Sequence, residues 1–377
     1  MYTTDTEKRW SRIRCLGDNT QNEHMAISST ITRSIRPRTS IVDDLLSPWE
    51  EFRRVIPLVS LKSLLHRSHS STPKVAVLLC TMQAQHFLAH QLNSIATQTH
   101  PSWAIWASDD GSDDHTHAIL EYYQSHWGEN RLSIHAGPSE GSTANFLSLT
   151  CRADIDADYF AYADQDDIWE ADKLGRAVAW LTTIPDNIPA LYGSRTLLVD
   201  SRNQHLGYSP LFTKMPSFRN ALVQSIAGGN TMVFNRAARN LLRNAGENVE
   251  AITHDWWAYL LITGCGGLVH YDPYPTVRYR QHLNNQFGAN QSISAHVTRA
   301  KLLLQGRFRG WVDAKVRALE QVRPMMTLEN RRVLDDFVQA RERRLSARLL
   351  GLKRTGIFRQ TALGNLGLLA AATINRL

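Results

Sequence analysis

Short apolar runs alternate with helical patterns along the first half of the chain. Four runs rich in Val, Ala, Ile, Leu and aromatic residues have the length of buried strands: 75–79, 103–107, 132–135 and 159–162. Between them, apolar positions recur three and four residues apart, as in Leu88, Leu92 and Ile95, and predict helices. This alternation is typical of an α/β fold in which helices cover both faces of a mainly parallel sheet.

The rest of the chain divides into three regions by its pattern. Residues 1–72 are polar, and we predict a partly disordered extension with some helical periodicity from Leu45 to Leu65. Residues 73–290 form the predicted catalytic domain and 291–377 a basic helical region, in which 328–350 has the pattern of one amphipathic helix. Weaker strand patterns lie at 196–199, 231–234, 268–271 and 277–280.

Composition narrows the class of protein. The four cysteines lie far apart among the 377 residues, which argues against a zinc cluster or a disulfide framework and favours the reducing cytoplasm. We find no apolar run of membrane-spanning length and no secretory signal. Residues 299–377 hold 17 Lys and Arg against 6 Asp and Glu, which predicts an anionic partner such as a nucleic acid or a lipid leaflet. No nucleic-acid-binding motif is present, so we do not expect nucleic acid as the partner.

An acidic segment follows the fourth apolar run. Asp164, Asp166 and Asp167 are three carboxylates within four residues, and they repel one another unless a cation lies among them. Oxygen ligands suit Mg²⁺ or Mn²⁺, and Mg²⁺ is usually shared between carboxylates and substrate phosphates. The alternative is a solvated acidic turn before a helix. Because ligands bind beyond the carboxyl ends of parallel strands, the placement favours the metal site.

Two further clusters have both a chemical and a structural interpretation. Asp109 and Asp110 follow the second run, where they suit a ribose or base contact or, together with Ser112, the start of a helix. Asp255, within His254-Asp255-Trp256-Trp257, suits a general base or a favourable charge at a helix N-terminus.

Polar segments around positions 230 and 280 complete the candidate chemistry. Arg280 suits a diphosphate clamp and His282 a metal or phosphate contact, although a strand edge followed by a turn explains both. Gly229 and Asn230 suit either a simple turn or the close approach of a sugar. A phosphate-binding Gly-x-x-x-x-Gly-Lys loop is absent from the sequence, which disfavours P-loop nucleotidases.

In this order, the motifs resemble family-2 glycosyltransferases of the GT-A fold, in particular a bacterial rhamnosyltransferase-like branch. The resemblance covers about residues 74–286 and rests on Thr81, the segment Gln91–Thr99, Ser108–Ser112, Gly141 with Asn145, Asp164–Trp169 followed by Lys173, His254–Trp257 and Tyr279–His282. One departure concerns Met82, where the family usually has an aromatic residue that stacks on the nucleobase.

The resemblance implies a role for each matching position. Thr81, Asp109, Asp110, Gly141, Asn145, Asp164 and Arg280 would bind the donor; Gly229, Asn230 and Trp256 would bind the acceptor; Asp166, Asp164 and His282 would hold Mg²⁺ or Mn²⁺; and Asp255 would be the catalytic base. The implied activity is inverting transfer of a sugar, rhamnose on the closest-looking branch, from a nucleotide diphosphate to a saccharide or lipid-linked acceptor in cell-surface polysaccharide synthesis.

Other interpretations stay open. A nucleotidylyltransferase on a similar sheet would usually carry a Gly-rich basic loop after the first strand, which this chain lacks. A non-catalytic relative that binds a glycan or nucleotide is the other alternative, although the carboxylates are intact. The segment Leu363–Ile374 is too short to span a bilayer, and it suits either an interfacial helix or one packed on the domain. We expect a cytoplasmic protein that contacts the inner face of the plasma membrane peripherally.

Overall fold

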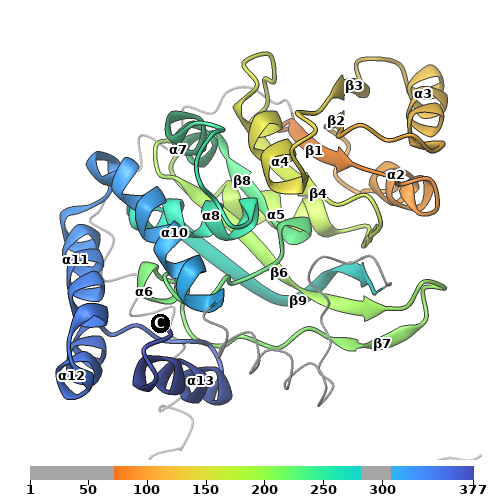
Figure 1. Cartoon of the computed structure of the whole chain (residues 1–377). Coiled ribbons are helices and arrows are strands. Elements are labelled where there is room, and N and C mark those ends of the chain that lie inside the picture. The colour runs from red at the N-terminus through yellow and green to blue at the C-terminus, as the bar shows by residue number, and fades with distance from the viewer. Residues whose placement is uncertain (1–71, 282–306) are drawn as a thin grey trace, which may run out of the picture. The chain divides into compact units, whose positions relative to one another are not determined.

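A computed structural model describes residues 72–281 and 307–377 (Figure 1). The predicted helical stretch at 45–65, the predicted boundary at 290 and His282 lie outside these residues. Residues from Ser70 to Leu377 form one compact unit, so the helical C-terminal region packs against the sheet domain.

The first half of the sheet is parallel, as predicted. β1 (Val75–Thr81), β2 (Trp103–Asp109), β3 (Leu132–Ala136) and β4 (Tyr159–Ala163) lie in the order β3-β2-β1-β4. All seven residues of β1 are buried, because alternate side chains enter two different cores: Ala76, Leu78 and Cys80 on one face, and Val75, Val77 and Leu79 on the other.

The second half of the sheet mixes strand directions. β8 (Val233–Asn235) pairs antiparallel with β4, followed by β6 (Ala190–Val199), β9 (Leu268–Arg280) and β5 (Ile168–Trp169), while β7 (His205–Tyr208) forms a hairpin with β6. The longest pairing, between β6 and β9, is again parallel, which confirms a mixed, mainly parallel sheet. The strands predicted at 268–271 and 277–280 are the two ends of β9, and 231–234 is divided between the short helix η3 (Gly229–Thr231) and β8.

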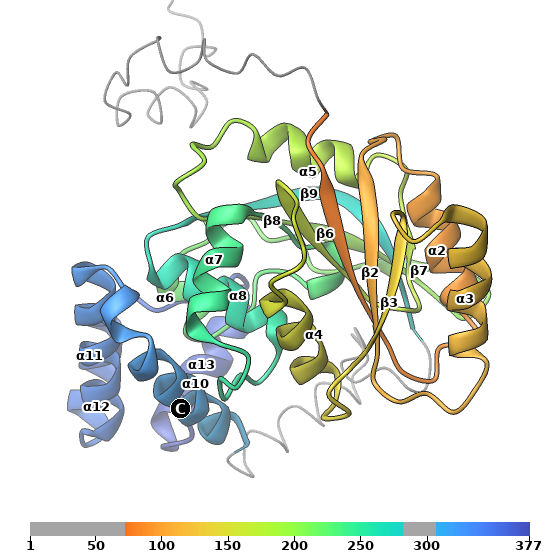
Figure 2. The same ribbon diagram turned by 90° about the horizontal axis from the view of Figure 1, so that it is seen from above.

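Helices cover both faces of the sheet (Figure 2). α2 (Leu88–Ala96), α3 (Thr116–Trp127) and α5 (Lys173–Leu181) pack on one face, where Leu88, Leu92 and Ile95 fill the core as their spacing predicts. α4 (Ser142–Cys151), α7 (Arg236–Ala245) and α8 (His254–Gly264) pack on the other. A short helix, α6 (Phe218–Ala221), precedes η3.

The C-terminal region is helical, as predicted, but its longest predicted helix is interrupted. It consists of α10 (Arg307–Gln321), η4 (Arg323–Met325), α11 (Leu328–Glu342), α12 (Leu345–Thr355) and α13 (Ala362–Thr373). The single helix predicted at 328–350 is wrong, because Arg343 and Arg344 are extended. The buried Arg348 stabilises this break by donating to the Arg343 carbonyl (2.9 Å) and the Ala372 carbonyl (2.9 Å).

Candidate active site

The carboxyl ends of β1 and β2 carry a small hydrogen-bonded network. The Thr81 hydroxyl donates to Asp109 Oδ1 (2.7 Å), which also accepts from the Ser112 hydroxyl (2.7 Å). The Ser112 amide donates to Asp109 Oδ2 (2.9 Å). Thr81 and Asp109 are register partners in the sheet, so strand pairing alone brings them together. The half-buried Asp109 therefore orders the turn that it begins.

Asp110 and Asn145 hold the neighbouring loop from within. The Asp110 carboxylate accepts from the amides of Ser139 (2.7 Å) and Gly141 (2.8 Å). The Asn145 side chain accepts from the Ser108 hydroxyl (2.6 Å) and donates to the Ser108 carbonyl (3.0 Å). Asp110 and Asn145 are 7% and 1% exposed, so their polar atoms serve the protein's own loop. The residues predicted to bind the donor thus share one edge of the sheet, and these two shape that edge from behind.

The acidic segment begins directly after β4. Burial, together with the charges of Asp166 and Asp255, raises the pKa of Asp164 to about 7. Within residues 72–281 and 307–377 no hydrogen-bond donor reaches the Asp164 carboxylate, which is partly exposed. A carboxyl group in such surroundings is stabilised as an anion only when a further cation arrives.

Asp167 has a different environment from its neighbours. It is fully buried, and it accepts from Asn230 Nδ2 (2.5 Å) and the Arg280 amide (3.1 Å). Burial and the charges of Asp166 and Asp164 raise its pKa. Asp167 therefore holds the acidic loop, residues 164–167, against η3 through Asn230 and against β9 through Arg280. The predicted acceptor role of Asn230 competes with this contact, since the amide is 3% exposed.

Arg280 lies beneath the acidic loop and does not face an open cleft. Its guanidinium donates to the carbonyls of Asp166 (2.8 Å) and Ser201 (2.9 Å), and the residue is 1% exposed. The Phe87 ring also packs against it, 4.5 Å from centroid to guanidinium carbon. These contacts with the main chain give Arg280 a structural role, and the diphosphate clamp stays a prediction.

Two residues near the acidic cluster were given no role by the sequence. The Gln165 amide pairs with the main chain of Met82, accepting from its N–H (2.6 Å) and donating to its carbonyl (2.9 Å). The ammonium of Lys173, at the start of α5, is fully buried 3.4 Å from the centroid of the Trp169 ring, and it has no hydrogen bond among the described residues. A polar residue between acids, and a lysine just after them, were the available signals.

Asp255 lies in the first turn of α8, where the helix dipole favours a negative charge. Its Oδ1 accepts from the Trp256 amide (2.7 Å), and the side chain is half-buried. The neighbouring His254 stacks on Phe146 with 3.8 Å between ring centroids, and burial lowers its pKa to about 4. A neutral, packed imidazole therefore lies at the start of the helix that carries Asp255, whose charge acts on Asp164.

Trp256 and Gly229 differ in how they relate to this site. The Trp256 indole donates to the Ala221 carbonyl (2.7 Å), and Lys315 of α10 lies 3.5 Å from the centroid of its ring. That places the ring at the junction with the helical C-terminal region, and the acceptor contact stays a prediction. Gly229, in contrast, packs directly against His254 and lies beside Asp255.

The close approach at Gly229 gives a stability prediction. A Cβ at this position would overlap His254 Nε2 and lie 3.3 Å from Asp255 Cβ. We expect Gly229→Ala to lower the free energy of unfolding by about 1–3 kcal/mol. Urea unfolding measures this, with Gly310→Ala of α10, where a Cβ meets nothing within 4 Å, as the matched control. Equal midpoints for Gly229→Ala and the wild type would contradict the tight packing.

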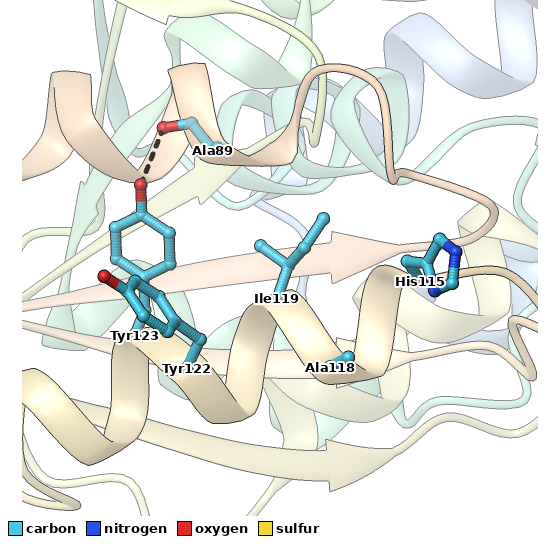
Figure 3. Close-up of a pocket in the computed structure, with 6 residues that line it drawn as sticks. All are labelled: Ala89, His115, Ala118, Ile119, Tyr122 and Tyr123. Atoms are coloured by element: carbon cyan, nitrogen blue, oxygen red, sulfur yellow. Dashed lines mark hydrogen bonds between the residues drawn. The ribbon is translucent and has the colours of Figure 1, made fainter.

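A separate groove of about 360 Å³ lies between α2 and α3 (Figure 3). It is lined by Ala89, His115, Ala118, Ile119, Tyr122 and Tyr123. None of the predicted site residues lines it, and it contains no carboxylate. The chemistry of the acidic cluster therefore lies elsewhere, at the carboxyl edge of the sheet.

Comparison with known proteins finds similarity to glycosyltransferases. Residues 76–242 match the model of the glycosyl transferase family 2. The dTDP-rhamnosyl transferase RfbG of Shigella flexneri is 29% identical over 255 residues, 64% of this chain and 84% of that protein. The Escherichia coli glucosyltransferase WfgD, which acts on a diphosphoundecaprenol-linked sugar, is 24% identical over 33% of this chain and 46% of its own length. The structure of TarS residues 1–349 from S. aureus has a TM-score of 0.46 and 14% identity, covering 75% of this chain and 90% of that one.

Proposed function

Because the chain belongs to glycosyltransferase family 2 and is a glycosyltransferase, we propose that it transfers rhamnose from a nucleotide diphosphate to a hydroxyl group, with inversion at the anomeric carbon. The similarity to a dTDP-rhamnosyl transferase over 84% of that protein supports this sugar and dTDP as the nucleotide. The acceptor is a saccharide or lipid-linked intermediate of cell-surface polysaccharide synthesis.

The observation that carries this proposal is the meeting of three carboxylates from distant parts of the chain. Asp164 and Asp166 follow β4, and Asp255 lies in the first turn of α8. The short helix η3 joins the two segments, because Gly229 packs beside Asp255 while Asn230 donates to Asp167. The charges of Asp166 and Asp255 both act on Asp164. One group able to accept a proton thus lies beside two able to share a cation. A nucleotide-sugar transferase needs this combination, since the nucleophile loses a proton while the leaving diphosphate gains charge.

The residues present fit a divalent cation. Among the described residues, no group of three or more His, Cys, Asp or Glu side chains is arranged to hold a metal by itself. Mg²⁺ needs only one or two protein carboxylates when substrate phosphates supply the other oxygens. Asp164, whose carboxylate lacks donors within the described part of the chain, and Asp166 would hold Mg²⁺ or Mn²⁺. When bound, the cation would offset the charge that develops on the diphosphate.

The protein's own groups have separate tasks in this mechanism. The Asp255 carboxylate takes the acceptor hydroxyl proton as that oxygen attacks the anomeric carbon opposite the departing diphosphate. Asp167 and Gln165 keep the acidic loop in place through Asn230 and Met82. Thr81 and Asp109 would line the nucleoside, while Asp110, Gly141 and Asn145 support the loop around it.

A donor screen tests the proposal. Purified protein is offered dTDP-rhamnose, UDP-glucose, UDP-N-acetylglucosamine and GDP-mannose, with Mn²⁺ or with EDTA, and release of the nucleoside diphosphate is measured. We expect release of the nucleoside diphosphate from dTDP-rhamnose and not from the other three donors. The rate of release should fall by at least about 10²-fold in EDTA, because the charge on the leaving diphosphate is then uncompensated. Equal rates with and without EDTA would reject the metal, and preference for another donor would reject rhamnose.

Location follows from the acceptor. Among the described residues, none of the helices has the length and apolar character needed to cross a bilayer. We place the protein in the cytoplasm, in peripheral contact with the inner face of the plasma membrane, where a lipid-linked acceptor is within reach.

A further inference from the structure

The outer face of α13 is unusual for a helix exposed to water. Its twelve residues, Ala362–Thr373, include no charged side chain. Leu368, Ala371 and Ala372 are buried against the domain, yet Leu363, Leu366 and Leu369 are 64%, 62% and 53% exposed. A surface helix normally turns charged or polar residues outward, so α13 is apolar on both sides.

A neighbouring loop extends this apolar face. The Lys214 main chain pairs with the Gln360 side chain, accepting at 2.9 Å and donating at 3.0 Å, just before α13 begins. Met215, next in the chain, is 73% exposed. The loop between β7 and α6 therefore borders the start of α13 and adds a further unburied apolar side chain. We call Met215, Leu363, Leu366 and Leu369 the apolar face.

The segment that contains α13 is strongly basic. Residues 343–377 include seven Lys and Arg and no Asp or Glu. Arg348 in the first half of α12 donates to the Ala372 carbonyl near the end of α13, so these two parts of the helices are in contact. Arg344, just before α12, and Lys353, in its last turn, are both exposed.

From this juxtaposition we infer that α13 lies in the interface of an anionic lipid bilayer, with the leucines of the apolar face among the acyl chains and the flanking basic residues at the headgroups. This inference deepens the proposed function and rests on it, because the lipid-linked acceptor is part of that proposal. An apolar helix face flanked by Lys and Arg matches interfacial anchors in composition. A second copy is the poorer occupant, because two surfaces of the same positive charge would oppose each other.

Vesicle sedimentation of the full chain tests the inference. Vesicles of phosphatidylcholine are compared with vesicles that also contain phosphatidylglycerol. We expect the wild type to sediment with the anionic vesicles, and Leu363→Asp/Leu366→Asp to lower the partition coefficient by about tenfold or more. Leu328→Asp on α11 is the matched control, since Leu328 is 71% exposed but outside the apolar face. Equal sedimentation of wild type and double variant would overturn the inference.

Two further measurements separate this inference from the proposed function. Calorimetry should give the same dTDP affinity for the wild type and for Leu363→Asp/Leu366→Asp. If the wild type did not bind dTDP, the proposed donor would be rejected, while the proposed membrane surface would not be affected. Lys353→Gln/Arg354→Gln should weaken sedimentation with anionic vesicles only. The lipid assignment would be overturned if the wild type formed a concentration-dependent dimer and did not bind vesicles, and if Leu363→Asp/Leu366→Asp abolished that dimer. The apolar face would then be an interface with a second copy.

Discussion

Replacement of Asp255 by Asn is expected to lower the rate of sugar transfer by about 10²–10⁴-fold, the usual contribution of a general base. The amide cannot take the acceptor proton, yet it keeps the size of the carboxylate. Its oxygen can still accept from the Trp256 amide, as Asp255 Oδ1 does at 2.7 Å, so the start of α8 should be retained. The measurement is the initial rate of nucleoside diphosphate release with the donor identified by the screen and its acceptor.

The control for Asp255→Asn separates chemistry from folding. Asp336 lies exposed on α11, and Asp336→Asn removes the same charge from a surface remote in the chain. Both variants should bind dTDP with wild-type affinity in calorimetry, because neither change touches the proposed nucleoside contacts. Turnover of Asp255→Asn within a few-fold of the wild type would remove Asp255 from the role of base.

Replacement of Asp166 by Asn is the second change with a large expected effect. Loss of one of two proposed carboxylate ligands should remove several kcal/mol of transition-state stabilisation, hence about 10²–10⁴-fold in kcat/KM. The rate should recover in part at high Mn²⁺, since the remaining oxygens still bind weakly. A Mn²⁺ titration of the transfer rate measures this, and an unchanged Mn²⁺ dependence would exclude Asp166 as a ligand.

A nearby carboxylate provides the matched control for Asp166. Asp172 precedes α5 in the same segment, and its contact is a partly exposed ion pair with Arg176 at 3.9 Å. Such pairs contribute little to stability. Asp172→Asn should therefore retain the wild-type rate and Mn²⁺ dependence. A loss in Asp172→Asn equal to that in Asp166→Asn would indicate a general effect of charge in place of ligation.

Local pattern was sufficient for the parallel half of the sheet. In β1 seven buried residues in a row are apolar or small, a short run that, in alternation with helical patterns, is typical of a strand buried on both faces. The acidic segment could also be recognised from the sequence, because its carboxylates follow a buried strand at short spacing. The single helix predicted at 328–350 was wrong. Arg348 bonds to the Ala372 carbonyl of a later helix, and a local helical pattern carries no information about so distant a partner.

The site residues were harder to assign, because a side chain's role depends on distant partners. Arg280 was predicted to face phosphate, yet the carbonyls of Asp166 and Ser201 lie against it. Trp256 was predicted to face the acceptor, yet its ring meets Lys315, nearly sixty positions later in the chain. In both cases the side-chain donor bonds to main-chain carbonyls that the fold brings near, which the sequence alone does not reveal.

The amino-acid sequence by itself determined the fold class, the resemblance to a family and the presence of an acidic segment after the fourth strand, since these depend on hydrophobic period and short spacing. Tertiary structure alone decided which of the acids are available for chemistry. The Asp167 carboxylate accepts hydrogen bonds from Asn230 and the Arg280 amide. The Asp164 carboxylate is partly exposed, and the charge of Asp255 acts on it. The physical reason is that burial and hydrogen-bond partners, not residue type, set the charge and reach of a carboxylate.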